Sequence, residues 1–318
     1  MRSRPNMVIN YGRTAATPGA RAIGMDETAY ESPKVLANDP LEQQRLKRLR
    51  LGYVRMDLVY AMSGDPTSKI ECGADGCDRD PSGDQWITAI KGIGAQPVVV
   101  VRTTSSVDAV NMVKHFNVNP ATGQPDTSLR NYVRYWIIGN EPNINGYSSQ
   151  AYSQYFNADY DAMKAVDPNI KIGGPTIAWY DQSWIQQFLQ GSGSRVDFVD
   201  FHGYPQSGTT PGDVTTLFKW ASSTGGDVRH LRTLISSMLP GRASSVGIEV
   251  GEWSLDSGGS AQLFTNFNAV WTADVLGNIL RSGGQSLYYG TKGNALKWSD
   301  GYVTNDHGVQ TYMHLDDP

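Results

Sequence analysis

The stretch Tyr135-Trp-Ile-Ile-Gly139 is a short apolar run that ends in the polar turn Asn140-Glu141-Pro142-Asn143. Seven other short apolar runs recur along the chain, and polar loops and helical patterns separate them. The eight runs cover residues 22–25, 53–57, 97–102, 135–139, 170–173, 196–201, 246–250 and 286–289. Such alternation is typical of parallel strands joined by helical crossovers.

The spacing of the runs predicts the fold class. They recur about every 38 residues, and eight strands at this period fit an α/β fold with a single (β/α)8 TIM barrel. The first strand has a competitor, because residues 7–10 (Met-Val-Ile-Asn) are also apolar. Helices are expected from Ser148 to Val166 and from Ala261 to Leu280, each next to a typical start or stop signal.

The length of 318 residues fits one such barrel. We expect residues 1–318 to form a single catalytic domain, with residues 1–20 as an N-terminal extension. The last predicted strand lies close to the end of the sequence, so no appended β-sandwich is expected.

Composition excludes several classes of partner. The chain has 27 Lys and Arg against 31 Asp and Glu, a net charge of −4, with no basic run. Neither a nucleic acid nor an anionic membrane is therefore expected as a partner. No apolar stretch approaches the roughly 18 residues of a membrane span. The 16 Tyr and 8 Trp residues suit an amphipathic ligand such as a sugar.

The chain contains two cysteines, Cys72 and Cys77, in a glycine-rich segment. Two thiols with no companion ligands cannot form a four-ligand zinc site. Their spacing favours a disulfide that pins one loop, and hence an exported protein, either extracellular or periplasmic. A pair of free thiols is the alternative. The N-terminus is basic but has no apolar signal core, which is expected either for an intracellular protein or for a chain that starts after a removed signal.

Two carboxylates are expected at one end of the barrel. Reactive groups of such barrels lie at the C-terminal ends of the strands. Glu141 follows the fourth run and Glu252 follows the seventh, three periods later. Strands four and seven are expected to lie nearly across the barrel, which can bring the two carboxyl groups to the roughly 5–5.5 Å that a retaining two-carboxylate mechanism needs. One group must be neutral and the other charged for this chemistry.

Glu249 is a rival for the position of Glu252 because it lies in the same run. The two residues are three positions apart, so on a regular strand they face opposite sides. Only one of them is then expected to point into the barrel mouth. Glu252 lies nearer the C-terminal end of the strand and is the preferred candidate.

The segment Trp136-Ile-Ile-Gly-Asn-Glu-Pro-Asn143 resembles the acid/base motif of the retaining glycoside hydrolases of the 4/7 superfamily, or clan A. Lys171-Ile-Gly-Gly-Pro175, Asp197-Phe-Val-Asp-Phe-His-Gly-Tyr204 and Gly251-Glu-Trp253 are most similar to family 39 and its relatives. The resemblance covers the chain from about residue 20 to residue 300. It implies that Glu141 is the general acid/base and Glu252 the nucleophile.

The same resemblance implies roles for four neighbours. Asn140 would bind the sugar 2-hydroxyl, and Tyr204 would donate a hydrogen bond to the nucleophile. Arg55, at the end of the second strand, would keep Glu252 ionised through its positive charge. His202 would line the sugar side or bridge the networks of the two carboxylates.

Three tryptophans follow strands at the same end of the barrel and are candidate platforms for sugar rings. They are Trp179, Trp253 and Trp298, and each has packing under a loop as its alternative. Lys292 lies in the loop after the last strand and is a candidate contact with no assigned role.

These observations predict a retaining glycoside hydrolase that cleaves a β-glycosidic bond of a polysaccharide, acts within the chain and is a monomer. No cofactor and no metal are expected. An exo-acting β-xylosidase-type enzyme, a carbohydrate-binding barrel without turnover and a metal-dependent barrel hydrolase are the alternatives. The sequence does not specify the sugar or the linkage.

Overall fold

The computed structural model describes residues 22–28, 36–37, 40–58, 72–73, 76–77, 82–102, 105–208, 210–257, 260–292, 297–299 and 302–304. Eight parallel strands close into a barrel in the order β1-β12-β11-β10-β9-β8-β5-β2. They are β1 (Ile23–Thr28), β2 (Tyr53–Leu58), β5 (Gln96–Val101), β8 (Tyr135–Ile138), β9 (Lys171–Ile177), β10 (Phe198–Gly203), β11 (Gly247–Trp253) and β12 (Gln285–Lys292). The predicted (β/α)8 class is confirmed, and the alternative first strand at residues 7–10 lies outside the described residues.

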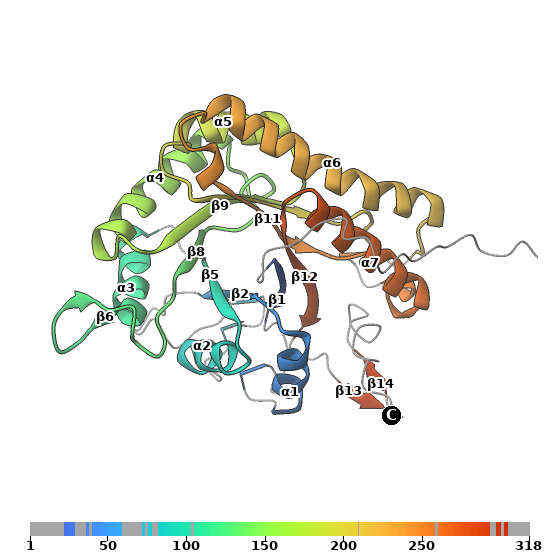
Figure 1. The fold of residues 1–318 in the computed structure, drawn as a ribbon, viewed down its shortest axis with the longest axis horizontal. Helices are drawn as coiled ribbons and strands as arrows, with labels where there is room; N and C mark the ends of the chain where they lie inside the picture. Colours follow the sequence, from blue (N-terminus) through green and yellow to red (C-terminus); the bar gives the residue numbers. More distant parts are fainter. Residues whose placement is uncertain are drawn as a thin grey trace, which may run out of the picture.

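Helices connect successive strands and surround the barrel (Figure 1). They are α1 (Pro40–Leu49), α2 (Gly83–Gly92), α3 (Ser106–Asn117), α4 (Ser149–Val166), α5 (Gln182–Ser192), α6 (Val214–Met238) and α7 (Asn266–Arg281). The predicted helix from Ser148 is α4, and the Ser148 hydroxyl accepts a hydrogen bond from the amide of Ala151. The helix expected over 261–280 is divided into a 3-10 turn, Ala261–Phe264, and α7.

Among the described residues, three two-stranded antiparallel sheets lie outside the barrel. They are β3 (Cys72–Gly73) with β4 (Gly76–Cys77), β6 (Val118–Asn119) with β7 (Gln124–Pro125), and β13 (Lys297–Ser299) with β14 (Tyr302–Thr304). The backbone of Cys72 pairs with that of Cys77. Their side chains are outside the described part, so the disulfide stays a prediction.

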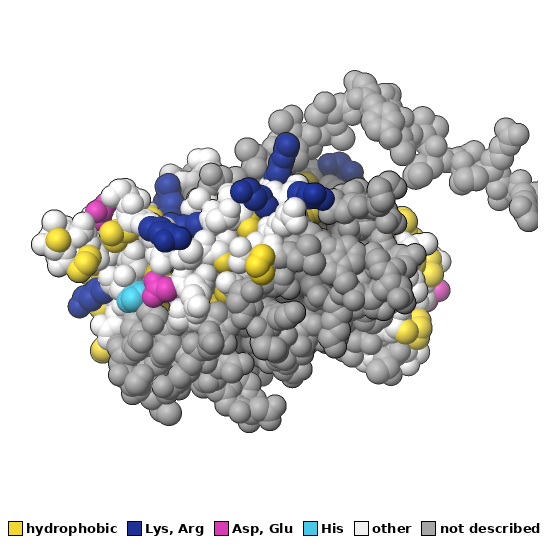
Figure 2. All heavy atoms as spheres, turned by 90° about the horizontal axis from the view of Figure 1, so that it is seen from below, with side chains coloured by type: hydrophobic (Ala, Val, Ile, Leu, Met, Phe, Trp, Pro, Cys, Tyr) yellow, Lys and Arg dark blue, Asp and Glu magenta, His cyan; other side chains and the backbone are white. Residues whose placement is uncertain are grey.

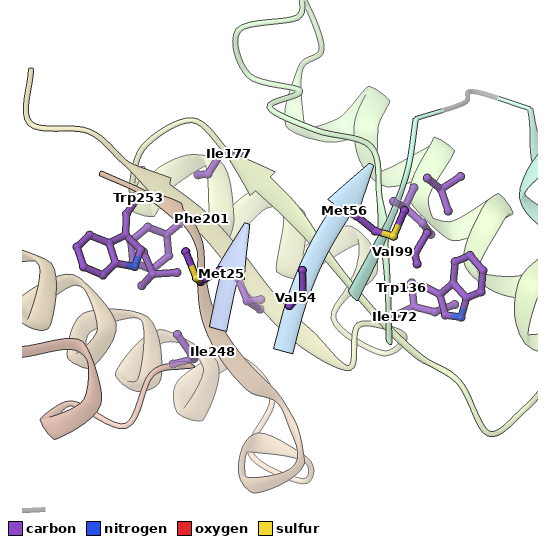
Figure 3. Packing of buried hydrophobic residues seen from close by; sticks show 14 of the residues in the cluster. Met25, Val54, Met56, Val99, Trp136, Ile172, Ile177, Phe201, Ile248 and Trp253 are labelled. Carbon is purple, nitrogen blue, oxygen red and sulfur yellow. The ribbon is translucent and has the colours of Figure 1, made fainter. Parts of the chain in front are cut away.

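The two faces of the barrel strands have different surroundings. Side chains on the outer face pack against the helices in one large core cluster, which includes Val54, Met56, Val99, Trp136 and Trp253 (Figure 3). A smaller apolar layer fills the barrel interior, formed by Tyr53, Val98, Val100, Ile137 and Phe198.

Charged side chains lie further along the inward-facing positions of the same strands. On β2 the inward alternation runs from Tyr53 to Arg55 and Asp57, and on β10 from Phe198 to Asp200 and His202. The apolar layer therefore closes the N-terminal end of the barrel, and the charged layer lies toward its C-terminal end.

The distribution of basic side chains on the surface agrees with the sequence, which contains no run of Lys or Arg. On the face shown in Figure 2, the Lys and Arg side chains of the described residues stand in separate small groups. Within the described residues, no helix has both the length and the apolar character to cross a membrane.

Candidate active site

Glu141 and Glu252 converge at the C-terminal end of the barrel, as predicted. One carboxylate oxygen from each and a ring nitrogen of His202 all lie within 4.8 Å of one another. Carboxyl groups of retaining glycosidases are about 5–5.5 Å apart, whereas those of inverting enzymes are about 6.5–9.5 Å apart. The geometry therefore matches the retaining arrangement.

The backbone of Glu141 is held in an uncommon conformation. Its φ angle is +47°, in the left-handed region that a residue with a side chain seldom adopts. The amide of Glu141 donates to the carbonyl of Thr176 at 2.9 Å, and its carbonyl accepts from the Asn145 side chain at 3.1 Å. Backbone strain of about 1–3 kcal/mol persists only where surrounding contacts impose it. These contacts fix the direction in which the Glu141 side chain leaves the barrel rim.

Glu252 reaches the barrel mouth through an extra residue in β11. Phe201 pairs with Val250 and His202 pairs with Glu252, so Gly251 has no partner on β10 and forms a β-bulge. The bulge resets the alternation of side chains. Glu249 is 3% exposed, and its electrostatic neighbours are Asp200, Arg55 and Asp26 inside the barrel. The expectation that Glu249 and Glu252 face opposite sides was therefore wrong, since both face inward at different depths.

Glu252 contacts three polar groups that hold both of its oxygens. The Tyr204 hydroxyl donates to Oε1 at 2.6 Å, which is the contact expected for this residue. Arg55 Nη1 lies 3.1 Å from Oε2, and His202 Nδ1 lies 3.4 Å from the same oxygen. These three contacts fix the orientation of the Glu252 carboxylate.

Arg55 lies 1% exposed beneath the two carboxylates. Besides Glu252, its guanidinium contacts the Asp26 carboxylate and donates to Oδ1 of Asn140 at 2.5 Å. Burial by itself lowers the pKa of Arg55, but the neighbouring carboxylates, with Asp26 first, outweigh burial and raise it. Arg55 thus carries a fixed positive charge and orients Asn140 beside Glu141.

His202 bridges the two carboxylates, one of the two roles expected for it. Its Nδ1 lies 3.0 Å from Oε1 of Glu141, and its ring is fully buried. Burial by itself lowers the pKa of His202, but Glu252 and the hydrogen bond to Glu141 raise it above its ordinary value. Burial also favours a higher pKa for Glu141, and His202 and Arg55 reverse this and lower it. The neighbouring charges therefore favour the protonated form of His202 and the ionised form of Glu141.

A cleft of about 600 Å³ opens in front of the carboxylates. Glu141, Glu252 and Tyr204 line one part of it, and Trp179, which is 53% exposed, lines another. Trp179 is therefore available to a ligand, as predicted for a platform. Gln206, Ser207 and Ser257 also line the cleft and were not singled out from the sequence. Their only signal was that they follow the ends of β10 and β11.

Trp253 is not a sugar platform, contrary to the prediction. It is 0% exposed, it packs against Trp271 with ring centroids 6.0 Å apart, and its indole nitrogen donates to the Ser286 hydroxyl at 2.9 Å. The bulge at Gly251 turns Glu252 inward, and the next side chain then points outward into the helix layer. The side chains of Lys292 and Trp298 lie outside the described part, so their predicted roles are not tested.

Glu141, His202 and Glu252 also form a set of donor atoms close enough to hold a metal ion. However, the guanidinium of Arg55 lies 3.1 Å from Glu252, and the pKa of His202 is raised, which favours its protonated form. Positive charge is already present next to both carboxylates. The donor set fits an ion-pair network better than a metal centre.

Comparisons with known proteins agree with the fold and the site. Residues 130–263, which include Glu141 and Glu252, match the family model described as glycosyl hydrolases family 39. A segment of 81 residues is 36% identical to a β-xylosidase of Geobacillus stearothermophilus, covering 23% of this chain and 16% of that protein.

Solved structures show the same fold. An α-L-arabinofuranosidase of Thermotoga maritima superposes with a TM-score of 0.64 at 18% identity, over 86% of this chain and 64% of that one. A monomeric β-xylosidase of Caulobacter crescentus gives a TM-score of 0.61 at 18% identity, over 94% and 69% of the two chains. The chain is therefore shorter than these proteins.

A closed barrel with two carboxylates at the C-terminal ends of its strands is an arrangement that retaining glycoside hydrolases use. Within this class, residues 130–263 are similar to glycosyl hydrolases family 39.

Proposed function

We propose that the protein is a retaining glycoside hydrolase that cleaves a glycosidic bond by double displacement. The observation that carries the proposal is the distance of at most 4.8 Å between oxygens of Glu141 and Glu252, together with their different partners. Glu252 is surrounded by Tyr204, Arg55 and His202, which stabilise its negative charge. Glu141 lies against His202, a proton donor, and is the acid/base.

In the first step, Glu252 attacks the anomeric carbon while Glu141 donates a proton to the leaving oxygen, and the glycosidic bond breaks. Because the pKa of Glu141 is lowered in the free site, this proton comes from His202 across the 3.0 Å contact. In the second step, water transfers a proton to Glu141 and attacks the anomeric carbon, which releases Glu252. Asn140, oriented by Arg55, faces the 2-hydroxyl of the sugar.

The substrate we propose is a β-linked polysaccharide cleaved within the chain. The support for this is the cleft of about 600 Å³ with the exposed Trp179 in its wall, which offers room beyond the sugar that reacts. An exo-acting β-xylosidase is the second candidate, favoured by the names of the relatives from Geobacillus stearothermophilus and Caulobacter crescentus. Export of the protein, expected from its cysteines, remains part of the proposal.

A panel of aryl β-xylosides, aryl α-L-arabinofuranosides and plant polysaccharides tests the reaction. Proton NMR of the first product formed must show the anomer of the substrate, and a product of opposite configuration would overturn the mechanism. Oligosaccharide ladders indicate endo-action, whereas xylose from the first minutes indicates the exo-acting candidate. A protein that binds a glycan but cleaves none supports the non-catalytic alternative, and loss of activity with a chelator supports the metal-dependent one.

Glu252→Ala with added azide tests the assignment of the nucleophile. Azide attacks the face that the missing carboxylate leaves open, so a glycosyl azide of inverted configuration is expected. Glu249→Ala is the matched control, because it removes a carboxylate from the same strand one layer deeper. Rescue of Glu249→Ala instead of Glu252→Ala would reverse the assignment.

A further inference from the structure

The direction of Glu252 depends on the bulge at Gly251. Ile248 and Val250 belong to the outer core cluster, and Glu249 between them points inward. On a regular strand, residue 251 would also point inward and residue 252 outward. The extra residue shifts this pattern by one position, so that Glu252 enters the site.

A buried carboxylate occupies the space beside the bulge. Oδ1 of Asp200, on the neighbouring strand β10, accepts a hydrogen bond from the amide of Gly251 at 2.7 Å. A Cβ atom added to Gly251 would lie 2.4 Å from each oxygen of Asp200 and 2.6 Å from its Cγ. Real Cβ atoms essentially never approach other atoms so closely. A side chain at residue 251 would therefore require the buried Asp200 carboxylate to move.

Asp200 is 0% exposed and lies deeper than the reacting carboxylates. Its Oδ2 has no hydrogen-bond partner among the described residues, and it lies 4.0 Å from Nε2 of His202. The catalytic chemistry outlined above does not use Asp200. Because one oxygen of Asp200 accepts a hydrogen bond from the amide of the bulge, its role differs from the catalytic roles of Glu141 and Glu252.

We propose that Asp200 is a positioning residue that holds the bulge at Gly251 and thereby aims Glu252 at the substrate. The inference rests on the glycosidase function proposed above. Asp200 acts in two ways. Its carboxylate accepts the Gly251 amide, which would otherwise be unpaired inside the barrel, and it fills the space that a side chain at residue 251 would need.

Paired substitutions test the steric part. Gly251→Ala alone places a methyl group against the Asp200 carboxylate, and we expect kcat/KM to fall about 100-fold because Glu252 is displaced. Asp200→Ala removes the three clashing atoms but also the acceptor of the Gly251 amide, so the double variant Asp200→Ala/Gly251→Ala should be about threefold more active than Gly251→Ala, close to Asp200→Ala alone, with a higher Tm than Gly251→Ala. Gly92→Ala is the control, since a Cβ there meets no atom within 4 Å. Independent effects that simply multiply, or a fully active Gly251→Ala, would overturn the proposal.

The conservative variant tests the hydrogen bond and does not depend on Gly251→Ala folding. Asp200→Ala should lower kcat about 30-fold with KM nearly unchanged, because the nucleophile is misdirected while the cleft is intact. Asp200→Asn keeps an oxygen acceptor of the same shape and should recover most of this loss. Asp167→Asn, at another fully buried aspartate, controls for general destabilisation. Equal losses in Asp200→Ala and Asp200→Asn, or none in either, would contradict the proposal.

Failure of the inference can be told apart from failure of the proposed function. The Tm values of the single and double variants report the contact between residues 200 and 251 in a protein with no glycosidase activity at all. Absence of activity in the wild-type protein would remove the function and leave this structural coupling measurable.

Discussion

At the residue scale, the hydroxyl of Tyr204 donates to Oε1 of Glu252 at 2.6 Å. We expect Tyr204→Phe to lower kcat/KM about 10- to 100-fold. The Glu252 carboxylate loses a short hydrogen bond that orients it for attack on the sugar and stabilises it when it leaves. Steady-state kinetics on the best aryl glycoside measure this effect. Tyr160→Phe removes a hydroxyl on the outer helix α4 and serves as control. Equal activity of the two variants would show that Tyr204 does not support the nucleophile.

His202 should set the basic limb of the pH profile. The pair Glu141 and His202 shares one proton in its active form, and the pKa of His202 is raised while that of Glu141 is lowered. The wild-type protein should therefore stay active until the pH exceeds the ordinary pKa of histidine. In His202→Asn, Glu141 must keep the proton alone, so the basic limb of kcat/KM should move down by about one pH unit or more. An unchanged limb would mean that His202 does not supply the proton.

Local motifs made some residues of the site predictable. Glu141 and Tyr204 lie in short segments that resemble a known family, and their positions after strands indicate which end of the barrel they reach. Asp26 lies in no recognised motif, and Asp200 lies inside the segment 197–204 that resembles family 39 but was not singled out there. Their importance arises from contacts with Arg55 and Gly251, which lie 29 and 51 positions away in the chain. Only the closed barrel brings these groups together.

At the element scale, the bulge in β11 explains two errors of the sequence-based view. A period of two residues predicts that Glu249 and Glu252 face opposite sides. A glycine at position 251 does not by itself predict a β-bulge with an extra residue. Once the bulge is known, Glu249 and Glu252 both point inward and Trp253 points outward. Strand periodicity is a good guide to the faces of a strand only where the pairing is regular.

Burial separates the roles of two tryptophans, Trp253 at the end of β11 and Trp179 just after β9. Trp253 is fully buried against Trp271, so Trp253→Ala should lower the free energy of unfolding by about 3–5 kcal/mol. Trp179 is 53% exposed in the cleft, so Trp179→Ala should change stability by less than about 0.5 kcal/mol and raise KM severalfold. Urea unfolding and steady-state kinetics on both variants measure these effects. Exchanged phenotypes would refute the assignment of the two side chains.

At the scale of the whole molecule, the number and order of the strands followed from the sequence because a repeated period is a global signal. The arrangement of apolar and charged layers inside the barrel did not follow from the sequence, although it determines where the active-site groups lie. Apolar side chains such as Val98 and Phe198 close one end, and the charged groups around Arg55 occupy the other. Which inward positions share a layer depends on strand register, and register is a property of the closed sheet.

This charged layer should make the stability of the molecule depend on pH. Burial raises the pKa of Asp200 from 3.8 to about 6. A raised pKa contributes stability that is fully present below the unfolded value of 3.8 and is lost as the pH rises through about 6. Relative to Asp200→Asn, the wild-type protein should thus lose up to about 3 kcal/mol of unfolding free energy between pH 4 and pH 7. Urea unfolding of both proteins across this range is the measurement, and parallel pH curves would contradict the raised pKa.

The central claim is that Glu252 forms a covalent bond with a sugar while Glu141 acts as the general acid and base. A 2-deoxy-2-fluoro glycoside with a good leaving group traps such an intermediate, because the fluorine slows its hydrolysis. Intact-protein mass spectrometry, followed by peptide mapping, should show one added sugar on Glu252. A label on Glu249 or another residue, or an active protein that never becomes labelled, would contradict the account.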